Sequence, residues 1–436
     1  MSLSTCVDTV YVRRYDGRFM SVPQTMTRRR TCALSSLGLV ALVTLLIASP
    51  RTNLAQASDE VRALWVTRAS ITTPAAIAAV VESARMSGFN TLLVQVRGRG
   101  DAYFTSTLEP RADALTGQPA DFDPLAEVIA RAHAQGLRVH AWTNVDLIAS
   151  ATELPSSRSH LIYRHPDWLM VPRPLAFELS KIDPRSPEYV GRLARWTRAA
   201  DDVEGLFLSP IHRDAADHVV AVVDDLVRRY PVDGVHLDYI RYPGPLFDYS
   251  RAALLAFRQD LDPAMTPVER LRFDPSSMTA LLAATDTYPE RWAGFRRSRL
   301  NALLLRIRTV VKSRRPQALL SAAVYPEALE ATTHRFQDWP MWVENRWLDV
   351  ICPMAYTPDA ATFALQIASV RQVAGTQPVW AGIGAYRLSP AQTVDNINTA
   401  RRLGASGIVL FSYDSLVHPP RGLEYLTTVS RAAFTP

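Results

Sequence analysis

From Glu60 onward the chain alternates between short apolar runs and longer amphipathic stretches. The short runs are typical of buried strands and the longer ones of helices with one apolar face. Eight strands are predicted, over residues 61–67, 91–96, 139–145, 234–240, 319–324, 348–354, 378–383 and 407–411. Helices are predicted over 74–87, 123–135, 214–230, 289–315, 360–373 and 390–403, with a closing helix near 423–433. Eight βα units favour an α/β fold, the (β/α)8 TIM barrel.

Two connections are much longer than the others. Residues 146–213, after the third strand, are expected to form an irregular insertion, and residues 242–288, after the fourth, a second one with short helical pieces. The alternative is an open doubly wound sheet. It would need a glycine-rich phosphate turn after the first strand, and residues 68–72 contain no glycine. We therefore expect one barrel domain over residues 58–436.

The first 57 residues have the three parts of a secretory signal peptide. Three arginines at positions 28–30 precede an uncharged run over residues 31–49, and Ala55-Gln56-Ala57 is a suitable cleavage site. Cleavage after Ala57 would release an exported protein, periplasmic or extracellular, with no stable membrane insertion. An uncleaved anchor is the alternative, because 19 uncharged residues just reach spanning length.

The formal net charge of +6 suggests at first a nucleic-acid or membrane partner. Seven Arg and two Asp lie in residues 1–57, so +5 of that charge belongs to this segment and about +1 to the rest. The domain itself is nearly neutral, and no nucleic-acid partner is expected.

Aromatic and polar residues gather where the predicted strands end. In such a barrel these ends meet at one rim, which carries the active site. The aromatic residues expected there, which could stack on sugar rings, are Trp65, Tyr103, Trp142, Tyr239, Tyr242, Tyr356, Tyr386 and Tyr413. The planar donors, which could bond hydroxyl or acetamide groups, are Arg68, Arg97, Asn144 and Arg241. This composition indicates a polysaccharide partner.

Four carboxylates lie at the same rim. Two carboxylates across a scissile bond are the minimal machinery of glycoside hydrolysis. Asp238 is predicted to be the nucleophile or the water-activating base and Glu327 the acid, with Asp101 and Asp414 as substitutes. Structural roles remain open for three of them: a salt bridge of Asp101 with Arg97 or Arg99, and a favourable position of Glu327 or Asp414 in the first turn of a helix.

A metal site is a weaker possibility at this rim. His140, His236 and Asp238 could in principle hold a metal ion, but no HxH pair or carboxylate-bridged cluster supports it. The two histidines are expected to be hydrogen-bonded barrel residues, and no metal or cofactor is predicted.

Several long runs of the sequence are distinctive. They are residues 60–67, GFNTLLVQVRGRGDAYF (88–104), DPLAEVIARAHAQGLRVHAWTNV (123–145) and RRYPVDGVHLDYIRYP (228–243), with weaker ones over 338–356 and 404–416. Together they resemble the bacterial glycosyl-hydrolase-like 10 family over nearly the whole mature chain. The resemblance implies an exported (β/α)8 barrel that acts on envelope glycans, with peptide-free peptidoglycan strands as the suggested substrate.

The resemblance also implies positions for site residues. It places on the family's conserved segments Gln95, Arg97, Arg99 and Asp101, then His140, Trp142 and Asn144, then His236, Asp238, Tyr239 and Arg241. Two departures stand out. Members commonly carry Pro-Gln-x-Tyr after the sixth strand, whereas this chain has Pro353-Met354-Ala355-Tyr356, which lacks that polar side chain. The segment over 196–208 is also longer than usual.

The leading hypothesis is an exported glycoside hydrolase that cleaves an amino-sugar polysaccharide of the envelope by carboxylate catalysis. The alternative is a non-catalytic glycan-binding barrel that has lost its acid. A metal-dependent deacetylase is a third possibility.

Overall fold

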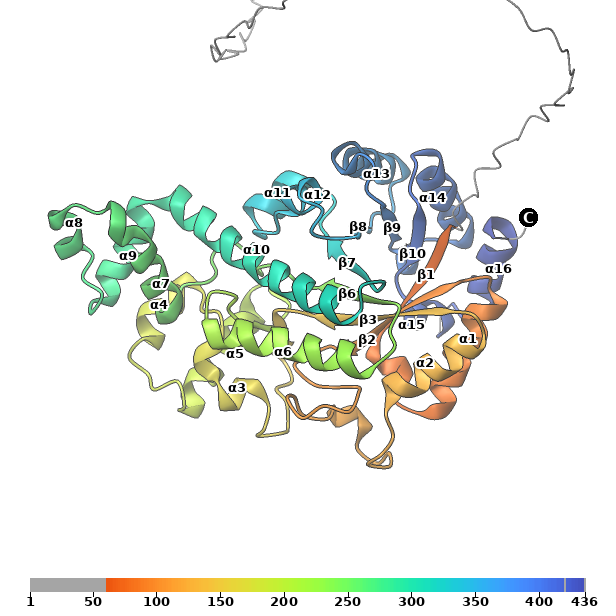
Figure 1. Ribbon diagram of the computed structural model, residues 1–436, viewed down its shortest axis with the longest axis horizontal. Coiled ribbons are helices and arrows are strands. Elements are labelled where there is room, and N and C mark those ends of the chain that lie inside the picture. The colour runs from red at the N-terminus through yellow and green to blue at the C-terminus, as the bar shows by residue number, and fades with distance from the viewer. Residues whose placement is uncertain (1–59, 419–420, 435–436) are drawn as a thin grey trace, which may run out of the picture. The chain divides into compact units, whose positions relative to one another are not determined.

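Eight parallel strands close into a barrel in the computed structural model, which describes residues 60–418 and 421–434 (Figure 1). The strands are β1 (Val61–Val66), β2 (Thr91–Arg97), β3 (Arg138–Asn144), β6 (Gly234–Asp238), β7 (Leu319–Val324), β8 (Val350–Ala355), β9 (Trp380–Ile383) and β10 (Gly407–Leu410). They are hydrogen-bonded in this order, and β10 pairs with β1 to close the ring. The predicted TIM barrel is confirmed. The predicted signal peptide and its cleavage site lie outside the described residues.

Helices surround the barrel, as the sequence predicts. They are α1 (Pro74–Met86), α2 (Pro124–Ala134), α6 (Arg213–Arg229), α10 (Pro289–Arg314), α11 (Ala328–Thr333), α12 (Trp339–Glu344), α13 (Ala360–Ala374), α14 (Pro390–Arg402), α15 (Tyr413–Val417) and α16 (Glu424–Ala433). Side-chain caps fix several of their starts: Asp123 accepts a hydrogen bond from the Ala126 N–H at 3.0 Å. Among the described helices, none is both long and apolar enough to cross a membrane.

The connection between β3 and α6 is more regular than the sequence suggests. It contains β4 (Leu147–Ala149), α3 (Leu161–Arg164), η3 (Pro166–Trp168), α4 (Arg173–Leu179), α5 (Pro187–Ala199) and β5 (Leu206–Phe207). The expectation of an irregular segment is wrong at α5, where Ser186 caps the helix and Tyr189, Val190 and Leu193 are buried on one face. Strands β4 and β5 pair as a small antiparallel sheet. The connection between β6 and α10 holds α7 (Arg251–Leu261), α8 (Pro267–Arg272) and α9 (Met278–Thr287).

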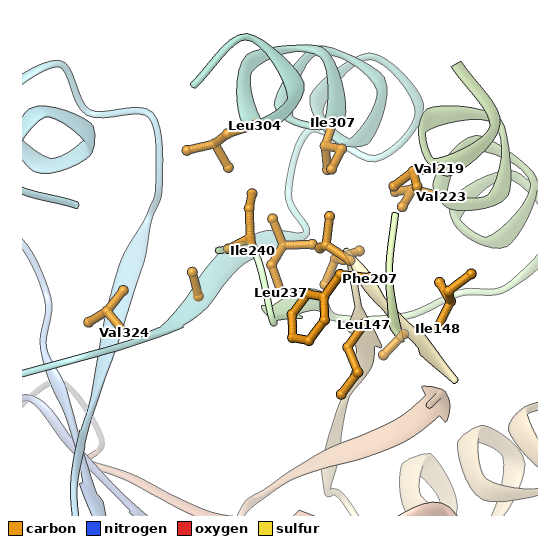
Figure 2. Close-up of a cluster of buried hydrophobic side chains, with 14 of the residues drawn as sticks. Leu147, Ile148, Phe207, Val219, Val223, Leu237, Ile240, Leu304, Ile307 and Val324 are labelled. Carbon is orange, nitrogen blue, oxygen red and sulfur yellow. The ribbon is translucent and has the colours of Figure 1, made fainter. Parts of the chain in front are cut away.

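The main core lies between the barrel and its outer helices. Figure 2 shows Val219 of α6 and Ile307 of α10 above Leu237 of β6, and all three are buried. The same cluster includes Leu147 and Phe207 of the small sheet. Burying one such side chain stabilises the fold by about 1.5–3 kcal/mol. The long connection after β3 is therefore fixed to the barrel by its own apolar residues.

A second core fills the barrel itself and is rich in tryptophan. Trp65, Trp142 and Trp380 point inward with Cys352 and several aliphatic side chains. Glycine makes room for these rings. A Cβ at Gly382 would lie 2.9 Å from Cη2 of Trp65, and one at Gly234 would lie 2.4 Å from Nδ1 of His140. The barrel interior is thus a packed floor beneath the rim.

Candidate functional site

A cavity of about 520 Å³ lies where the strands end. Of the residues predicted for the rim, those that line it are Trp65, Arg68, Gln95, Tyr103, Trp142, Asn144, Asp238, Tyr239, Arg241 and Tyr356. The carboxyl ends of β1, β2, β3, β6 and β8 bring these residues together. The rim predicted from the strand ends is therefore a real concave surface.

Asp238, the last residue of β6, is the acidic residue that lines this cavity. Its Oδ1 accepts hydrogen bonds from the Tyr239 N–H at 2.7 Å and from Nη1 of Arg241 at 3.1 Å. None of these bonds uses Oδ2. Burial, the largest cause, raises the pKa of Asp238 above its usual range, and Glu204 adds to this, although Arg241 and the Tyr239 N–H oppose it. Asp238 therefore holds a proton more readily than an ordinary aspartate.

The backbone conformation of Tyr239 helps to fix the side chain of Asp238. Tyr239 is not a glycine, yet its φ is +50°, a left-handed conformation that costs free energy. The turn aims its N–H at Asp238, and its ring lies 4.0 Å from the guanidinium carbon of Arg241. Strain at this position is consistent with a site held in one geometry by its surroundings.

Arg241 joins two carboxyl groups. Its Nη1 contacts Asp238, and its Nη2 lies 3.4 Å from Oε1 of Glu204, so one guanidinium holds both. Arg241 itself is buried, and the charges of Glu204 and Asp238 raise its pKa despite its burial. Glu204 is partly exposed, with 31% of its side chain accessible. A second carboxylate, which does not itself line the cavity, is thus held by the same guanidinium as Asp238.

A chain of amide contacts orders the wall formed by β2 and β3. Asn144 donates to the Gly98 carbonyl at 2.8 Å, and its Oδ1 accepts from Nε1 of Trp142 at 3.0 Å. Gln95 donates to the same Oδ1 at 3.4 Å and accepts from Nη1 of Arg68 at 2.9 Å. These contacts hold planar donors and acceptors in place before any ligand arrives.

The two predicted histidines lie below the cavity. Nε2 of His236 accepts from Nε1 of Trp65 at 3.0 Å, so its Nδ1 carries the proton and donates to Ser321 at 2.9 Å. Burial lowers the pKa of His236 to about 3 and that of His140 to about 4. Both are therefore neutral at pH 7 and support the floor. In the described part of the chain, no three His, Cys, Asp or Glu side chains gather as a metal site requires.

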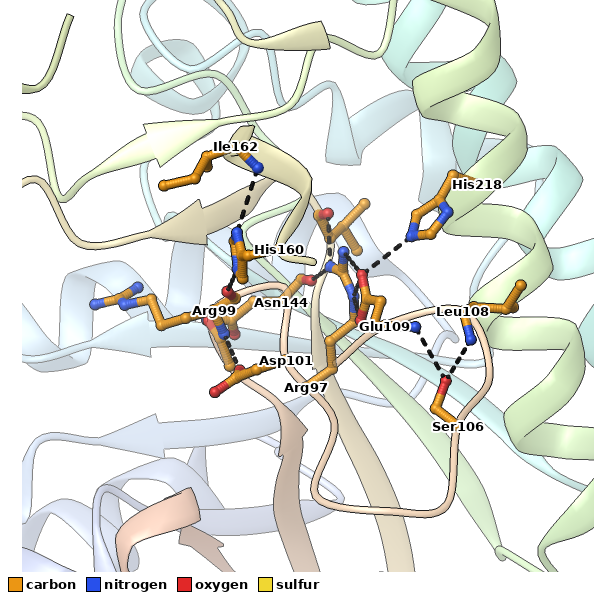
Figure 3. A network of polar contacts seen from close by, with 12 residues as sticks. Arg97, Arg99, Asp101, Ser106, Leu108, Glu109, Asn144, His160, Ile162 and His218 are labelled. Carbon is orange, nitrogen blue, oxygen red and sulfur yellow. Dashed lines mark hydrogen bonds and ion pairs between the residues drawn. The ribbon is translucent and has the colours of Figure 1, made fainter. Parts of the chain in front are cut away.

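Arg97 does not reach the cavity, because it is used inside the protein (Figure 3). Its Nε and Nη2 form a bidentate pair with Glu109 at 2.8 and 2.6 Å, and its Nη1 donates to the carbonyls of Asn144 and Val145. His218 of α6 also contacts Glu109 at 3.3 Å. These contacts join the loop after β2 to the end of β3. Arg97 therefore stabilises the rim without contacting the cavity.

The remaining predicted residues lie outside the cavity. Asp414 accepts from the Thr67 N–H at 2.8 Å and from Ser70, so it joins α15 to the end of β1. Glu327 is exposed and accepts from Gln366 at 2.6 Å. Asp101 forms no salt bridge among the described residues and instead accepts from the Arg99 N–H at 2.8 Å. Tyr413 is buried in the first turn of α15.

Sequence reasoning missed Glu204 and assigned no substrate contact to Arg99, which only the family resemblance places on a conserved segment. Glu204 lies in the long connection after β3, where three acidic residues in four positions resemble an ordinary surface loop. It is brought to Arg241 because the next residues form β5, which pairs with β4. Arg99 lines the cavity, as do Thr67 and Phe411. A usable signal was the short apolar run after Gly205, which marks a strand.

A closed parallel barrel with aromatic rings, arginines and a buried carboxyl at its mouth defines the class of TIM-barrel proteins that resemble glycoside hydrolases. The solved structures agree in fold. The glycoside hydrolase domain of PgaB (BpsB) from Bordetella bronchiseptica has a TM-score of 0.60 at 14% identity, over 86% of this chain and 100% of that chain. A GH42 β-galactosidase from G. stearothermophilus has a TM-score of 0.54 at 15% identity, over 86% of this chain and 56% of that chain.

The chain belongs to the glycosyl hydrolase-like 10 family, whose sequence profile matches residues 60–398. It is 27% identical over 224 residues to the glycosyl hydrolase YngK of Bacillus subtilis (strain 168), over 47% of this chain and 38% of that protein. It is 25% identical over 340 residues to the glycosyl hydrolase DigH of Escherichia coli (strain K12), over 71% of this chain and 69% of that protein. The family resemblance predicted from the sequence motifs is confirmed.

Proposed function

We propose that this protein is a glycoside hydrolase that cleaves an amino-sugar polysaccharide of the bacterial envelope, such as peptide-free peptidoglycan strands. The observation that carries the proposal is the pair of carboxyl groups, Asp238 and Glu204, held by Arg241 beside the cavity. Two carboxyl groups flanking a glycosidic bond are what such a reaction needs. The family and its barrel relatives support the same reaction class.

The proposed acid is Asp238, because burial raises its pKa and leaves it protonated more readily than an ordinary aspartate. It donates its proton to the glycosidic oxygen as the C–O bond breaks. Glu204, as the carboxylate, acts on the anomeric carbon directly or through a water molecule. From the sequence alone, Asp238 is predicted to be the nucleophile or base and Glu327 the acid. In this proposal Asp238 is the acid, and the second carboxyl group is Glu204 rather than Glu327.

The substrate class follows from the cavity lining. Tyr239, Tyr356 and Phe411, which line the cavity and are partly exposed, offer aromatic surfaces to the apolar faces of sugar rings, above the buried Trp65 and Trp142. Arg68 and Tyr239, which are partly exposed, offer polar groups suited to hydroxyl and acetamide groups, while Gln95 and Asn144 order the wall behind them. We also propose that the reaction takes place outside the cytoplasm, on the strength of the signal-peptide pattern in residues 28–57.

Peptide-free peptidoglycan strands are the first substrate to test. The purified protein should release new reducing ends from them at a rate that a chelator leaves unchanged. Release of acetate without new reducing ends would identify a deacetylase instead. Binding of the strands with neither product would replace hydrolysis by the non-catalytic alternative.

The second carboxylate can be assigned with a matched pair of variants. Glu204→Gln should lower kcat by about 10²- to 10⁴-fold, the usual contribution of a positioned acid or base. Glu327→Gln, an equally small change at another exposed glutamate, should keep most of the wild-type rate because Glu327 is bonded to Gln366, whereas Arg241 holds Glu204. The opposite ranking in steady-state assays would return the role to Glu327.

A further inference from the structure

Two arginines stand on a wall shared by two cavities. Arg68 and Arg99 line both the 520 Å³ cavity and a neighbouring one of about 310 Å³. Arg68 comes from the turn after β1 and Arg99 from the loop after β2, and both are partly buried. Neither takes part in the catalytic step proposed above.

Arg99 is unusual because its guanidinium has no partner. Within residues 60–418 and 421–434, no hydrogen bond or ion pair joins it to another group, whereas its backbone N–H and carbonyl are bonded to Asp101 and His160. Figure 3 shows its side chain extending away from the dashed contacts. A partly buried arginine normally finds an acceptor, since each unmet donor costs free energy.

Arg68 brings a second positive charge to the same wall without a carboxylate. Its Nη1 donates to the neutral Gln95 amide at 2.9 Å. It lies so close over Gly98 that a Cβ there would be 2.7 Å from its Cδ and Nη1. Burial and the charge of Arg68 both lower the pKa of Arg99, which shows that the two guanidinium groups repel each other. An anion bound to both would relieve this repulsion.

The charges on either side of the wall decide where that anion lies. The smaller cavity is lined by three acidic residues, Asp101, Asp113 and Glu153, which balance the charges of its three arginines, Arg68, Arg99 and Arg111. The larger cavity is lined by three arginines, Arg68, Arg99 and Arg241, and by one acidic residue, Asp238. An anion is therefore favoured on the side of the larger cavity, beside the proposed reaction centre.

We propose that Arg68 and Arg99 together bind a carboxylate carried by the glycan substrate. The proposal rests on the proposed function, since it gives the hydrolase a preference for acidic chains. Peptide-free peptidoglycan strands carry such a group in the free lactyl carboxylate of each muramic acid residue. In intact peptidoglycan that carboxylate is an amide with the peptide and has no charge. The arginine pair would therefore distinguish strands without peptides from strands that still carry them.

The test compares one polymer in two forms: peptide-free strands, and the same strands with their lactyl carboxylates converted to methylamides. For the wild-type protein kcat/KM should be about 10- to 100-fold higher on the free carboxylate, as expected for charge-assisted hydrogen bonds. In Arg99→Met the ratio should fall close to 1. Arg99→Lys, which keeps the charge, should restore part of the preference.

Arg213→Met is the matched control, because Arg213 lies on α6 with 90% of its side chain exposed and lines neither cavity. It should keep the wild-type ratio. Equal loss on both polymers in Arg99→Met would overturn the carboxylate assignment. If the wild-type protein cleaves neither polymer, the hydrolase proposal fails by itself. Calorimetric binding of the two polymers then decides the anion site, and equal affinities would overturn it.

Discussion

Replacement of Asp238 by Asn should lower kcat on polymeric glycan by about 10³-fold, within the range that a positioned proton donor supplies. The amide keeps the shape of the side chain and can still accept from the Tyr239 N–H and Arg241. It carries no proton that it can give to the leaving oxygen. The loss should therefore appear in the chemical step, with little change in the affinity for the glycan.

The leaving group distinguishes an acid from a nucleophile. An aryl glycoside whose phenol is acidic needs little protonation, so Asp238→Asn should lose much less activity on it than on the polymer. An equal loss on both substrates would identify Asp238 as the nucleophile or base. The pH profile gives a second measurement: activity should fall as pH rises through the pKa of Asp238, and this alkaline limb should disappear in the variant.

Asp146→Asn is a suitable control for the fold. Asp146 is also buried and follows β3, but it does not line the cavity. Burial raises the pKa of Asp146 well above its usual range, so a neutral amide is close to its native form. This variant should keep most of the wild-type rate and its melting temperature. A similar loss in both variants would indicate damage to the strand ends rather than a lost proton donor.

Replacement of Arg97 by Met should destabilise the protein by about 3–5 kcal/mol, the cost of leaving one charge of a buried pair alone. Both side chains are nearly inaccessible, with 1% of Arg97 and 0% of Glu109 exposed. The exposed pair Arg131–Glu127 on α2 is the control, and Arg131→Met should cost less than about 1 kcal/mol. Calorimetric melting temperatures give the comparison.

Two further variants test the explanation. The double variant Arg97→Met/Glu109→Leu removes both charges and should be more stable than Arg97→Met alone. A double variant that is less stable than the single one would contradict the buried-charge explanation.

The pair also predicts a pH dependence. Burial would raise the pKa of Glu109, but Arg97 and His218 outweigh it and lower the pKa to about 2. A carboxyl whose pKa is depressed in the folded state stabilises the protein above its unfolded pKa, and this stabilisation is lost as pH falls toward 2. Glu109→Gln should therefore show a weaker dependence of the melting temperature on pH in that acidic range than the wild-type protein. Parallel curves would refute this assignment.

The barrel could be predicted because its signals are local. Each strand is a short, largely buried run, and the parallel topology then brings the ends of all strands to one rim. For this reason the sequence alone predicts that Asp238, Asn144 and Trp65 lie at the same rim. These residues are far apart in the sequence, but the closed ring of strands brings them close together in space.

Other parts depended on contacts that no local pattern encodes. The position of Glu204 requires β5 to pair with β4; the apolar run after Gly205 indicates a strand, but no local pattern says which strand it pairs with. Arg97 and Arg99 are two residues apart and look equivalent in the sequence, yet one is clamped by Glu109 and the other faces the cavity. Asp414 is predicted as a catalytic candidate because it follows the end of a strand. The same position allows it instead to accept a hydrogen bond from the Thr67 N–H at the end of the neighbouring β1.

The tryptophan floor gives the binding site a built-in optical label. Trp65 and Trp142 line the cavity, and the Nε1 of each already donates a hydrogen bond, to His236 and Asn144. Both indoles are almost fully buried and cannot reorient easily, so a sugar ring bound in the cavity above them changes the polarity around two fixed chromophores. The intrinsic fluorescence of the protein therefore reports occupancy directly, with no dye attached and no catalytic turnover required.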